Sequence, residues 1–351
     1  MTTLKSFVTL CAVSALVLTG CQGPVEPAPE QPVEGVTEEG GQEGEALPVD
    51  GDLWPLTGLP RDGADASAPA LSAKIDNHPL ARPQVGLDEA DIVFEELVEG
   101  GLTRYVAVWH SSLPPEVGPV RSVRPMDPDI VSPLGGILAY SGGQQRFIEA
   151  MLDSPVASAI HGQSDVNDFF YRTSTAVAPH NVIVRAPELV AYFADREGPA
   201  PQFAYSPSVA ESTAVVSGSE VTNLRVVFSS FQRPSWEWSA EAEAFLRHQP
   251  NGAADTASSG AQLSADNVVV LFVDIQVIQD IPTTNLIGEG QGFVATGGRV
   301  VEVNWSKAAK EAPIELTDGA GARVLLAPGQ TWVELIPADT SGVQAGALEL
   351  E

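Results

Sequence analysis

Hydrophobic and polar residues alternate over short runs along most of the chain, which is the pattern of half-buried β-strands. In the first half this pattern predicts strands over Leu71–Asp76, Asp91–Val98, Arg104–Trp109, Ile137–Tyr140 and Asn181–Arg185. Helical spacing of apolar residues predicts helices over Gln144–Leu152 and Glu188–Arg196. In the first helix, one face should carry Phe147, Ile148, Met151 and Leu152. Strands mixed with helices predict an α+β or α/β domain with a mixed sheet.

After residue 205 the pattern becomes almost entirely that of strands separated by Gly and Asp turns. The predicted strands are Leu224–Phe228, Asn267–Val277, Phe293–Thr296, Val300–Trp305, Arg323–Leu326 and Thr331–Ile336. Gly297-Gly298 and Asp318-Gly319 are hairpin signals, whereas residues 251–260 (NGAADTASSG) predict a mobile loop. We therefore expect an N-terminal domain over residues 53–205, a smaller mostly-β C-terminal domain over residues 206–340, and a tail over residues 341–351.

The first 20 residues have the pattern of an export signal. Lys5 precedes the apolar run FVTLCAVSALVL, which is too short to span a bilayer but fits a secretory signal peptide. Leu18-Thr19-Gly20-Cys21 resembles the lipobox of bacterial lipoprotein precursors. That resemblance implies cleavage before Cys21 and lipidation of its thiol, with palmitate as a typical acyl chain. The protein would then be anchored by lipid to the extracytoplasmic face of the cell membrane; an ordinary secretory signal is the alternative.

The segment that follows, residues 21–52, predicts a solvated tether. It contains nine carboxylates and no basic or aromatic residue, so it cannot bury enough apolar surface to fold. The chain has two cysteines, Cys11 in the signal and Cys21 at the lipidation site. The mature protein would therefore have no disulfide, no thiolate metal site and no cysteine nucleophile.

The charge balance excludes one class of partner and singles out one residue type. With 46 acidic and 18 basic residues the net charge is -28, which argues against nucleic-acid binding. Residues 53–205 nevertheless contain nine arginines and one lysine, and a guanidinium suits bidentate contacts to carboxylate or phosphate. We expect an anion-binding site made from four arginines in loops or at strand ends: Arg82, Arg104, Arg121 and Arg124. The alternative is that they form salt bridges with carboxylates nearby in sequence.

Carboxylates in the same region offer a second kind of chemistry. Asp91, Glu96 and Glu99 are candidate catalytic groups that would handle protons or hold a divalent cation. Because side chains alternate along a strand, Glu95 and Glu99 should point one way and Glu96 the other. Asp127 and Asp129 form a further candidate pair. No other cofactor is expected. The alternative to a catalytic or metal-binding role is that these carboxylates form a charged strand edge.

Two of the five histidines stand out. His78 and His180 each lie beside a proline and close to an asparagine, where they would serve either as catalytic bases or as donors that stabilise a turn. No two histidines have the spacing of zinc ligands. Serine-hydrolase chemistry is not indicated either, because Ser141-Gly142-Gly143 lacks the G-x-S-x-G pattern.

These segments together resemble the YerB-like family of bacterial lipoproteins. The resemblance rests on DNHP (76–79), RPQVGLDEADIVFEELVEGG (82–101), TR (103–104), VGPVRSVRP (117–125), SGG (141–143), PHNV (179–182), GEGQG (288–292), Trp305-Ser306-Lys307 and PGQTWVELIP (328–337). It implies an envelope lipoprotein with two domains of unknown function and no established reaction. Residues 245–262 depart from the family pattern, so no role is assigned to them.

A looser similarity connects the chain with the LytR-CpsA-Psr phosphotransferases. It would place Asp91 at the opening of a strand and Arg121 and Arg124 around a polyprenyl pyrophosphate.

Three hypotheses follow for the function. The protein binds an anionic, phosphorylated envelope or wall intermediate; or it is a wall-active hydrolase or transferase; or it is a non-enzymatic scaffold for envelope proteins.

Overall fold

The computed structural model describes residues 51–351. The predicted signal peptide, Cys21 and nearly all of the tether lie outside the described residues. Within the described part, no helix is long and apolar enough to cross a membrane.

One long mixed sheet organises residues 51–351. Its strands follow the order β10 (Ser219–Glu220), β18 (Arg299–Lys307), β17 (Gly288–Thr296), β15 (Asn267–Ile278), β21 (Thr331–Pro337), β2 (Ile92–Leu97), β3 (Thr103–Trp109), β1 (Leu71–Asp76), β5 (Ile137–Tyr140) and β6 (Ala157–Ile160). Two further strands extend it: β16 (Ile281–Asn285) pairs with β15, and β19 (Glu315–Thr317) pairs with β18.

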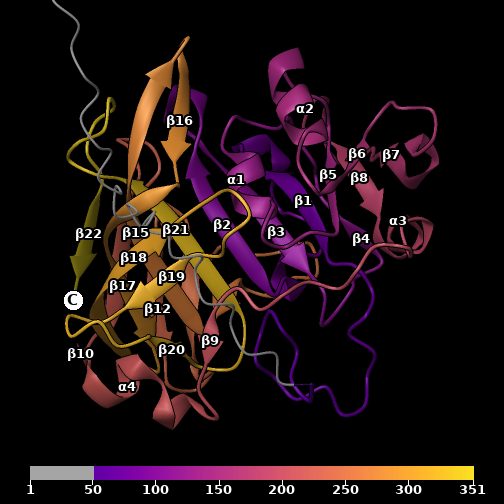
Figure 1. The fold of residues 1–351 in the computed structure, drawn as a ribbon. Coiled ribbons are helices and arrows are strands. Elements are labelled where there is room, and N and C mark those ends of the chain that lie inside the picture. The colour runs from indigo at the N-terminus through magenta and orange to yellow at the C-terminus, as the bar shows by residue number, and fades with distance from the viewer. Residues whose placement is uncertain (1–50) are drawn as a thin grey trace, which may run out of the picture. The chain divides into compact units, whose positions relative to one another are not determined.

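The N-terminal and C-terminal halves of the chain meet inside this sheet. Strand β21 lies between β15 and β2 and pairs in parallel with both of them. Figure 1 shows the yellow β21 next to the indigo-to-purple β2. Backbone hydrogen bonds therefore run without a break from one half to the other.

Three smaller sheets and four short helices surround the long sheet. A five-stranded sheet is formed by β14 (Ser264–Ala265), β13 (Ala244–His248), β12 (Ser235–Ser239), β11 (Asn223–Val227) and β22 (Ala347–Leu350). The others are β4 (Glu116–Val117) with β8 (Val182–Arg185) and β7 (Phe170–Arg172), and β20 (Leu325–Leu326) with β9 (Ala204–Tyr205). The α-helices of the described chain are α1 (Asp127–Val131), α2 (Gln145–Leu152), α3 (Ala186–Tyr192) and α4 (Thr213–Ser217).

The predicted fold class is confirmed: the first half combines helices with a mixed sheet, and the smaller second half is mostly strands. Two helical details were wrong. Leu152 does not share the buried face of α2 but is 57% exposed, because a helix turns by about 100° per residue and carries it away from Met151. Helix α3 begins at Ala186 rather than Glu188, with Pro187 in its first turn, and ends at Tyr192.

The alternation of side chains along β1, β2 and β3 gives this part of the sheet two different faces. Glu95 and Tyr105 are cross-strand partners and point toward the five-stranded sheet, where Glu95 contacts Arg247 of β13. Glu96 and Arg104 are the next pair and point the opposite way, where Glu96 and Asp127 of α1 both bind Lys74 of β1. Each face carries its own cluster of charged residues.

Candidate functional site

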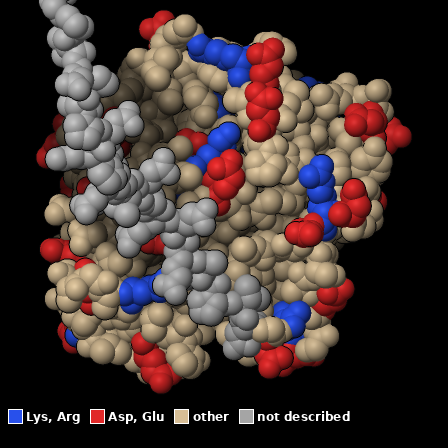
Figure 2. Space-filling view, in the orientation of Figure 1, with Lys and Arg blue, Asp and Glu red and all other residues tan. Residues whose placement is uncertain are grey.

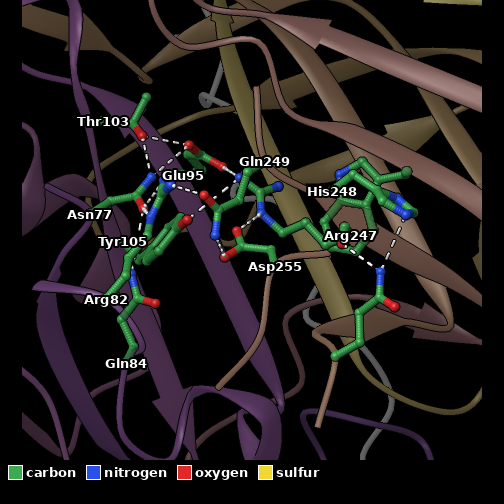
Figure 3. Close-up of polar contacts among 12 residues, drawn as sticks. Asn77, Arg82, Gln84, Glu95, Thr103, Tyr105, Arg247, His248, Gln249 and Asp255 are labelled. Atoms are coloured by element: carbon green, nitrogen blue, oxygen red, sulfur yellow. Dashed lines mark hydrogen bonds and ion pairs between the residues drawn. The ribbon is translucent and has the colours of Figure 1, made fainter. Parts of the chain in front are cut away.

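The first cluster is closed off from solvent between the long sheet and the five-stranded sheet. We call it the sealed cluster, and it consists of Arg247, Glu95, Glu334 and Asp255. The Arg247 side chain is 0% exposed. Its Nη2 lies 2.5 Å from Glu95 Oε2, its Nη1 3.0 Å from Glu334 Oε1 and its Nε 3.2 Å from Asp255 Oδ2. Figure 3 shows Arg247 reaching from the second half of the chain toward Glu95 of the first.

Aromatic rings complete the surroundings of Arg247. The guanidinium carbon lies 4.7 Å from the ring centroid of Trp332, 5.1 Å from that of Trp236 and 5.8 Å from that of Tyr105. The indole Nε1 of Trp236 also donates to Glu334 Oε1 at 2.7 Å. Such desolvated cation–π contacts hold a guanidinium in one orientation.

Glu334 is the member of the sealed cluster with the altered titration. Burial and the neighbouring Glu95 raise its pKa to about 8, against the opposing effect of Arg247. Its Oε2 atom is buried and receives no hydrogen bond, which fits a neutral carboxyl at pH 7. A neutral Glu334 reduces the excess of negative charge around Arg247, and the sealed cluster joins the two halves of the chain.

Arg82 belongs to the rim of this sealed region rather than to the other predicted arginines. Its Nη2 and Nε donate to Asn77 Oδ1 at 2.6 and 3.0 Å, and its Nη1 donates to Gln249 Oε1 at 3.0 Å. Figure 3 shows these residues beside Glu95 and Asp255. The predicted quartet of arginines is therefore divided between the two faces of the sheet.

The second cluster lies on the opposite face, at the end of β1. We call it the open cluster, and it consists of Asp76, His78, His180, Arg104 and Arg121. Asp76 Oδ2 lies 2.6 Å from His180 Nδ1 and 3.1 Å from Arg121 Nε, and Asp76 Oδ1 accepts the backbone N–H of His78 at 3.0 Å. The rings of His78 and His180 stack with centroids 4.3 Å apart and planes at 17°.

Arg104 and Arg124 converge on one backbone carbonyl beside this cluster. Arg104 Nη1 donates to Ser122 O at 2.6 Å, and Arg124 Nη1 donates to the same oxygen at 3.3 Å. Burial, followed by the positive charges of Arg124 and Arg121, lowers the pKa of Arg104 to about 10. Within the described chain, Arg104 has no carboxylate within 4 Å.

Glu99 does not share a direction with Glu95, so that prediction was wrong. Strand β2 ends at Leu97, and Glu99 begins the short 3-10 turn Glu99–Gly101, where strand alternation no longer applies. Its Oε2 lies 2.9 Å from both Nε and Nη2 of Arg124. The charge of Arg124 is thus matched by Glu99, and the pKa of Glu99 is lowered although burial acts in the opposite direction.

Glu96 is already occupied by a buried lysine. Lys74, in the middle of β1, forms ion pairs with Glu96 and, at 2.6 Å, with Asp127 Oδ1, and all three side chains are fully buried. Burial lowers the pKa of Lys74 to about 8, while Asp127 acts to raise it. Asp127 and Asp129 do not act together, because Asp129 lines a small cavity with Lys307.

Asp91 lies far from the arginines. Glu96 lies five positions further along the chain, roughly 16 Å away at about 3.3 Å per strand residue. Asp91 Oδ2 accepts the backbone N–H groups of His110 and Ser111, both at 2.8 Å. Burial raises its pKa to about 6. The arrangement expected from the similarity to LytR-CpsA-Psr enzymes, with Asp91 beside Arg121 and Arg124, is not formed.

The chemistry of a bound cation finds little support in this geometry. Among residues 51–351, no group of three or more His, Cys, Asp or Glu side chains is arranged to hold a metal ion. The candidate carboxylates instead face Lys74, Arg124 or backbone amides.

Several segments that are distant in sequence meet at the open cluster. Asp76 ends β1, the Arg121 carbonyl accepts the Ser141 N–H after β5 at 2.9 Å, and His180 precedes β8. The carboxyl ends of parallel strands, here β1 and β5, are where ligands bind in many α/β sheets. The side chain of Arg121 is 21% exposed and that of His180 12%, so the cluster is accessible from solvent.

Sequence reasoning missed the central residues of both clusters. No role is predicted for Asp76 from the DNHP motif, although its place at a strand end before His78 is a usable signal. Lys74 was detectable as the single lysine of residues 53–205. Arg247 and Asp255 lie in the region 245–262 to which no role was assigned, and Asp255 is buried although it lies in the predicted loop 251–260.

Comparisons with known proteins agree with this architecture. The model described as "Protein of unknown function (DUF3048) N-terminal domain" matches residues 56–199, and the model of the corresponding C-terminal domain matches residues 224–333. The chain is 25% identical over 298 residues to a Bacillus subtilis (strain 168) protein named "Putative lipoprotein YerB", which covers 83% of this chain and 88% of that protein. A crystal structure of the YerB protein from Bacillus subtilis has the same fold, with a TM-score of 0.71 and 23% identity over 85% of this chain and 99% of that one.

The two matched segments occur in order along one chain, and the strands they contain pair with each other in one sheet. The resemblance seen in the motifs is therefore confirmed, and this protein belongs to the DUF3048 family of YerB-like proteins.

Proposed function

We propose that the open cluster binds a phosphate-type anion carried by a molecule of the cell envelope. The observation that carries this proposal is Arg104: a guanidinium that is 8% exposed, close to Arg121 and Arg124, with no carboxylate within 4 Å among the described residues. Asp76 and Glu99 act on Arg104 from a longer distance, so a bound anion would supply the direct charge partner. Buried cations without such a partner are unfavourable, so their retention points to a ligand.

The surrounding charges support this choice of ligand. Arg121 faces Asp76 and Arg124 faces Glu99, so Arg104 is the member of the three left for an external anion. On the face of the molecule drawn in Figure 2, most basic side chains lie beside acidic ones, as expected at a net charge of -28. Among the buried arginines of the described chain, Arg124 and Arg247 face carboxylates within 4 Å and Arg104 does not.

Binding of simple anions tests the proposal. Inorganic phosphate and dimethyl phosphate are titrated into the protein by calorimetry, and we expect both to bind. Arg121→Gln should weaken binding tenfold or more, because a hydrogen bond to a charged group contributes about 1.5–3 kcal/mol. Arg225→Gln, which removes an arginine of β11 that is 51% exposed, should leave binding unchanged. If neither anion binds the wild-type protein, the proposal fails and the scaffold hypothesis is favoured.

We further propose that the protein is held at the membrane by a lipid on Cys21. The support is the lipobox-like Leu18–Cys21 segment, together with the similarity to a protein named as a lipoprotein. A Cys21→Ser variant should then move from the membrane fraction to the soluble fraction and lose incorporation of a palmitate analogue. Continued lipid labelling of that variant would contradict the assignment.

A further inference from the structure

The two histidines of the open cluster each have one ring nitrogen without a partner, and these two atoms differ in hydrogen-bonding character. A carboxylate only accepts, so His180 Nδ1 donates to Asp76 Oδ2 at 2.6 Å and the Nε2 of this neutral ring carries a lone pair. His78 Nδ1 instead accepts the Leu80 N–H at 3.1 Å, so the Nε2 of that neutral ring carries a hydrogen. Within residues 51–351 neither Nε2 atom has a hydrogen-bond partner. The open cluster therefore presents one acceptor and one neutral donor.

Asp76 and the ring stack fix the positions of these two atoms. Asp76 is buried at the end of β1, where its Oδ1 accepts the His78 backbone N–H and its Oδ2 binds the His180 ring. Because the ring centroids are 4.3 Å apart, the two Nε2 atoms lie within reach of a single small ligand. Arg121 Nε lies 3.1 Å from the same Oδ2 atom, which places a guanidinium next to the His180 ring.

An acceptor among these donors discriminates between kinds of anion. Arg104 and Arg121 attract any anion, and the Nε2–H of His78 adds a neutral donor. The lone pair of His180, however, repels an anion oxygen that carries no hydrogen, whereas an oxygen that carries one donates to it. A site built around such a hydrogen bond rejects a ligand that lacks the matching hydrogen, because its polar group is then left unpaired.

We infer that the open cluster selects a phosphate group that carries its own hydroxyl, which is a terminal phosphate rather than an internal phosphodiester. This inference rests on the proposed anion site, because Arg104 and Arg121 supply the attraction for the anion. In the bound state the hydroxyl on phosphorus donates to His180 Nε2, and a second phosphate oxygen accepts the Nε2–H of His78. The remaining oxygens face the two arginines. Both histidines stay neutral, and no proton is transferred.

Inorganic phosphate and sulfate are the probes that isolate this hydroxyl. At about pH 8, where an ordinary imidazole is neutral, hydrogen phosphate and sulfate have the same tetrahedral shape and the same charge, but only hydrogen phosphate has an O–H group. Calorimetric titration of the wild-type protein should show phosphate binding more tightly than sulfate by about tenfold or more. Dimethyl phosphate, which also lacks the hydroxyl, should still bind through the arginines but more weakly than phosphate.

Two variants separate the acceptor from the donor. His180→Phe keeps a ring against His78 but removes the lone pair, so the ratio of phosphate to sulfate affinity should fall to about one. His78→Phe removes the neutral donor, so it should weaken both anions to a similar degree and preserve the ratio. A merely structural role of the two rings would not produce this split between selectivity and affinity.

His248→Phe is the matched control, because this ring of β13 is 20% exposed and lies 3.8 Å from the carboxylate of Glu237. It should change neither affinity nor the ratio. Equal binding of phosphate and sulfate by the wild-type protein would overturn this inference and leave the anion site standing, as would an unchanged ratio in a folded His180→Phe protein. Absence of binding by phosphate, sulfate and dimethyl phosphate would overturn both. The wild-type comparison decides the inference even where His180→Phe does not fold.

Discussion

The sealed and open clusters use similar residues on opposite faces of the same three strands, yet they are built differently. In the sealed cluster every nitrogen of the Arg247 guanidinium faces a carboxylate, and three aromatic rings surround it. In the open cluster Arg104 has no such carboxylate, and two histidine Nε2 atoms have no partner in the described chain. The sealed cluster pairs its cation completely within the protein, whereas the open cluster leaves specific polar groups available to a ligand.

This difference separates structural from functional use of charge. Buried polar groups that are all paired join elements and fix their register. Partly exposed polar groups that are held in place but incompletely paired are expected where a ligand binds. The sealed cluster joins β2, β13 and β21, so its loss should damage the fold; loss of a group in the open cluster should damage binding.

The largest effect is expected at Arg247. Arg247→Met removes the cation and leaves Glu95 and Asp255 buried without their partner, which should lower the free energy of unfolding by about 3–5 kcal/mol. Urea denaturation measures this change. Arg225→Met, at a pair with Glu349 that is exposed on both sides, should change stability by less than about 0.5 kcal/mol. Equal effects of the two variants would show that the sealed cluster does not hold the fold.

Asp76 should have an intermediate effect, since it is buried but belongs to the open cluster. Asp76→Asn removes the charge that faces Arg121 and His180, and we expect a loss of about 1–3 kcal/mol of stability by thermal or urea denaturation. The exposed Asp153→Asn at the end of α2 should have no measurable effect. A loss as large as that of Arg247→Met would erase the distinction between the clusters.

The pH dependence of stability distinguishes Glu334 from other carboxylates. Its pKa in the fold is about 8, above the ordinary 4.5, so the folded state retains a proton that the unfolded state releases. Stability should therefore fall as pH rises from about 5 to 8, by at most about 1.4 kcal/mol per pH unit from this group. Glu334→Gln should flatten the profile between pH 6 and 8.

Asp91→Asn provides the comparison for that measurement. Its pKa of about 6 is also raised by burial, so this variant should flatten the profile only below about pH 6. If both variants flatten the same pH range, the assignment of the upper range to Glu334 is incorrect.

The smallest effect on stability is expected at Arg121. Its side chain is partly exposed, so Arg121→Gln should lower the free energy of unfolding by less than about 1 kcal/mol, although we expect it to weaken anion binding tenfold or more. Calorimetric titration and urea denaturation of the same variant measure both quantities. A stability loss above about 2 kcal/mol would place Arg121 with the structural residues instead.

Strand periodicity by itself determined much of the framework. Leu71–Asp76 and Ile137–Tyr140 were predicted with the bounds that the structure has, because each is a short apolar run between clear turn residues. The hairpin at Gly297-Gly298 was also confirmed, since both glycines adopt the positive φ that this turn requires. These features depend on interactions between residues that are close in sequence.

Strand β13 shows where that reasoning fails. Its inward-facing positions are Phe245 and Arg247, and the outward-facing position between them is Leu246, so charge points in and an apolar side chain points out. A pattern that assumes apolar residues inside cannot detect such a strand. The same inversion hides Lys74 in β1, where a charged side chain occupies a fully buried position.

The sequence alone therefore determined the fold class, most strands of the long sheet and the set of motifs that belong to the site. Only the tertiary structure decided which of those motif residues meet. The parallel pairing of β21 with β2 brings Glu334 beside Glu95, and the side-chain alternation of β2 sends Glu95 and Glu96 to different sides. Local periodicity carries no information on contacts between residues so far apart in sequence, because these depend on which strands become neighbours when the chain collapses around its core.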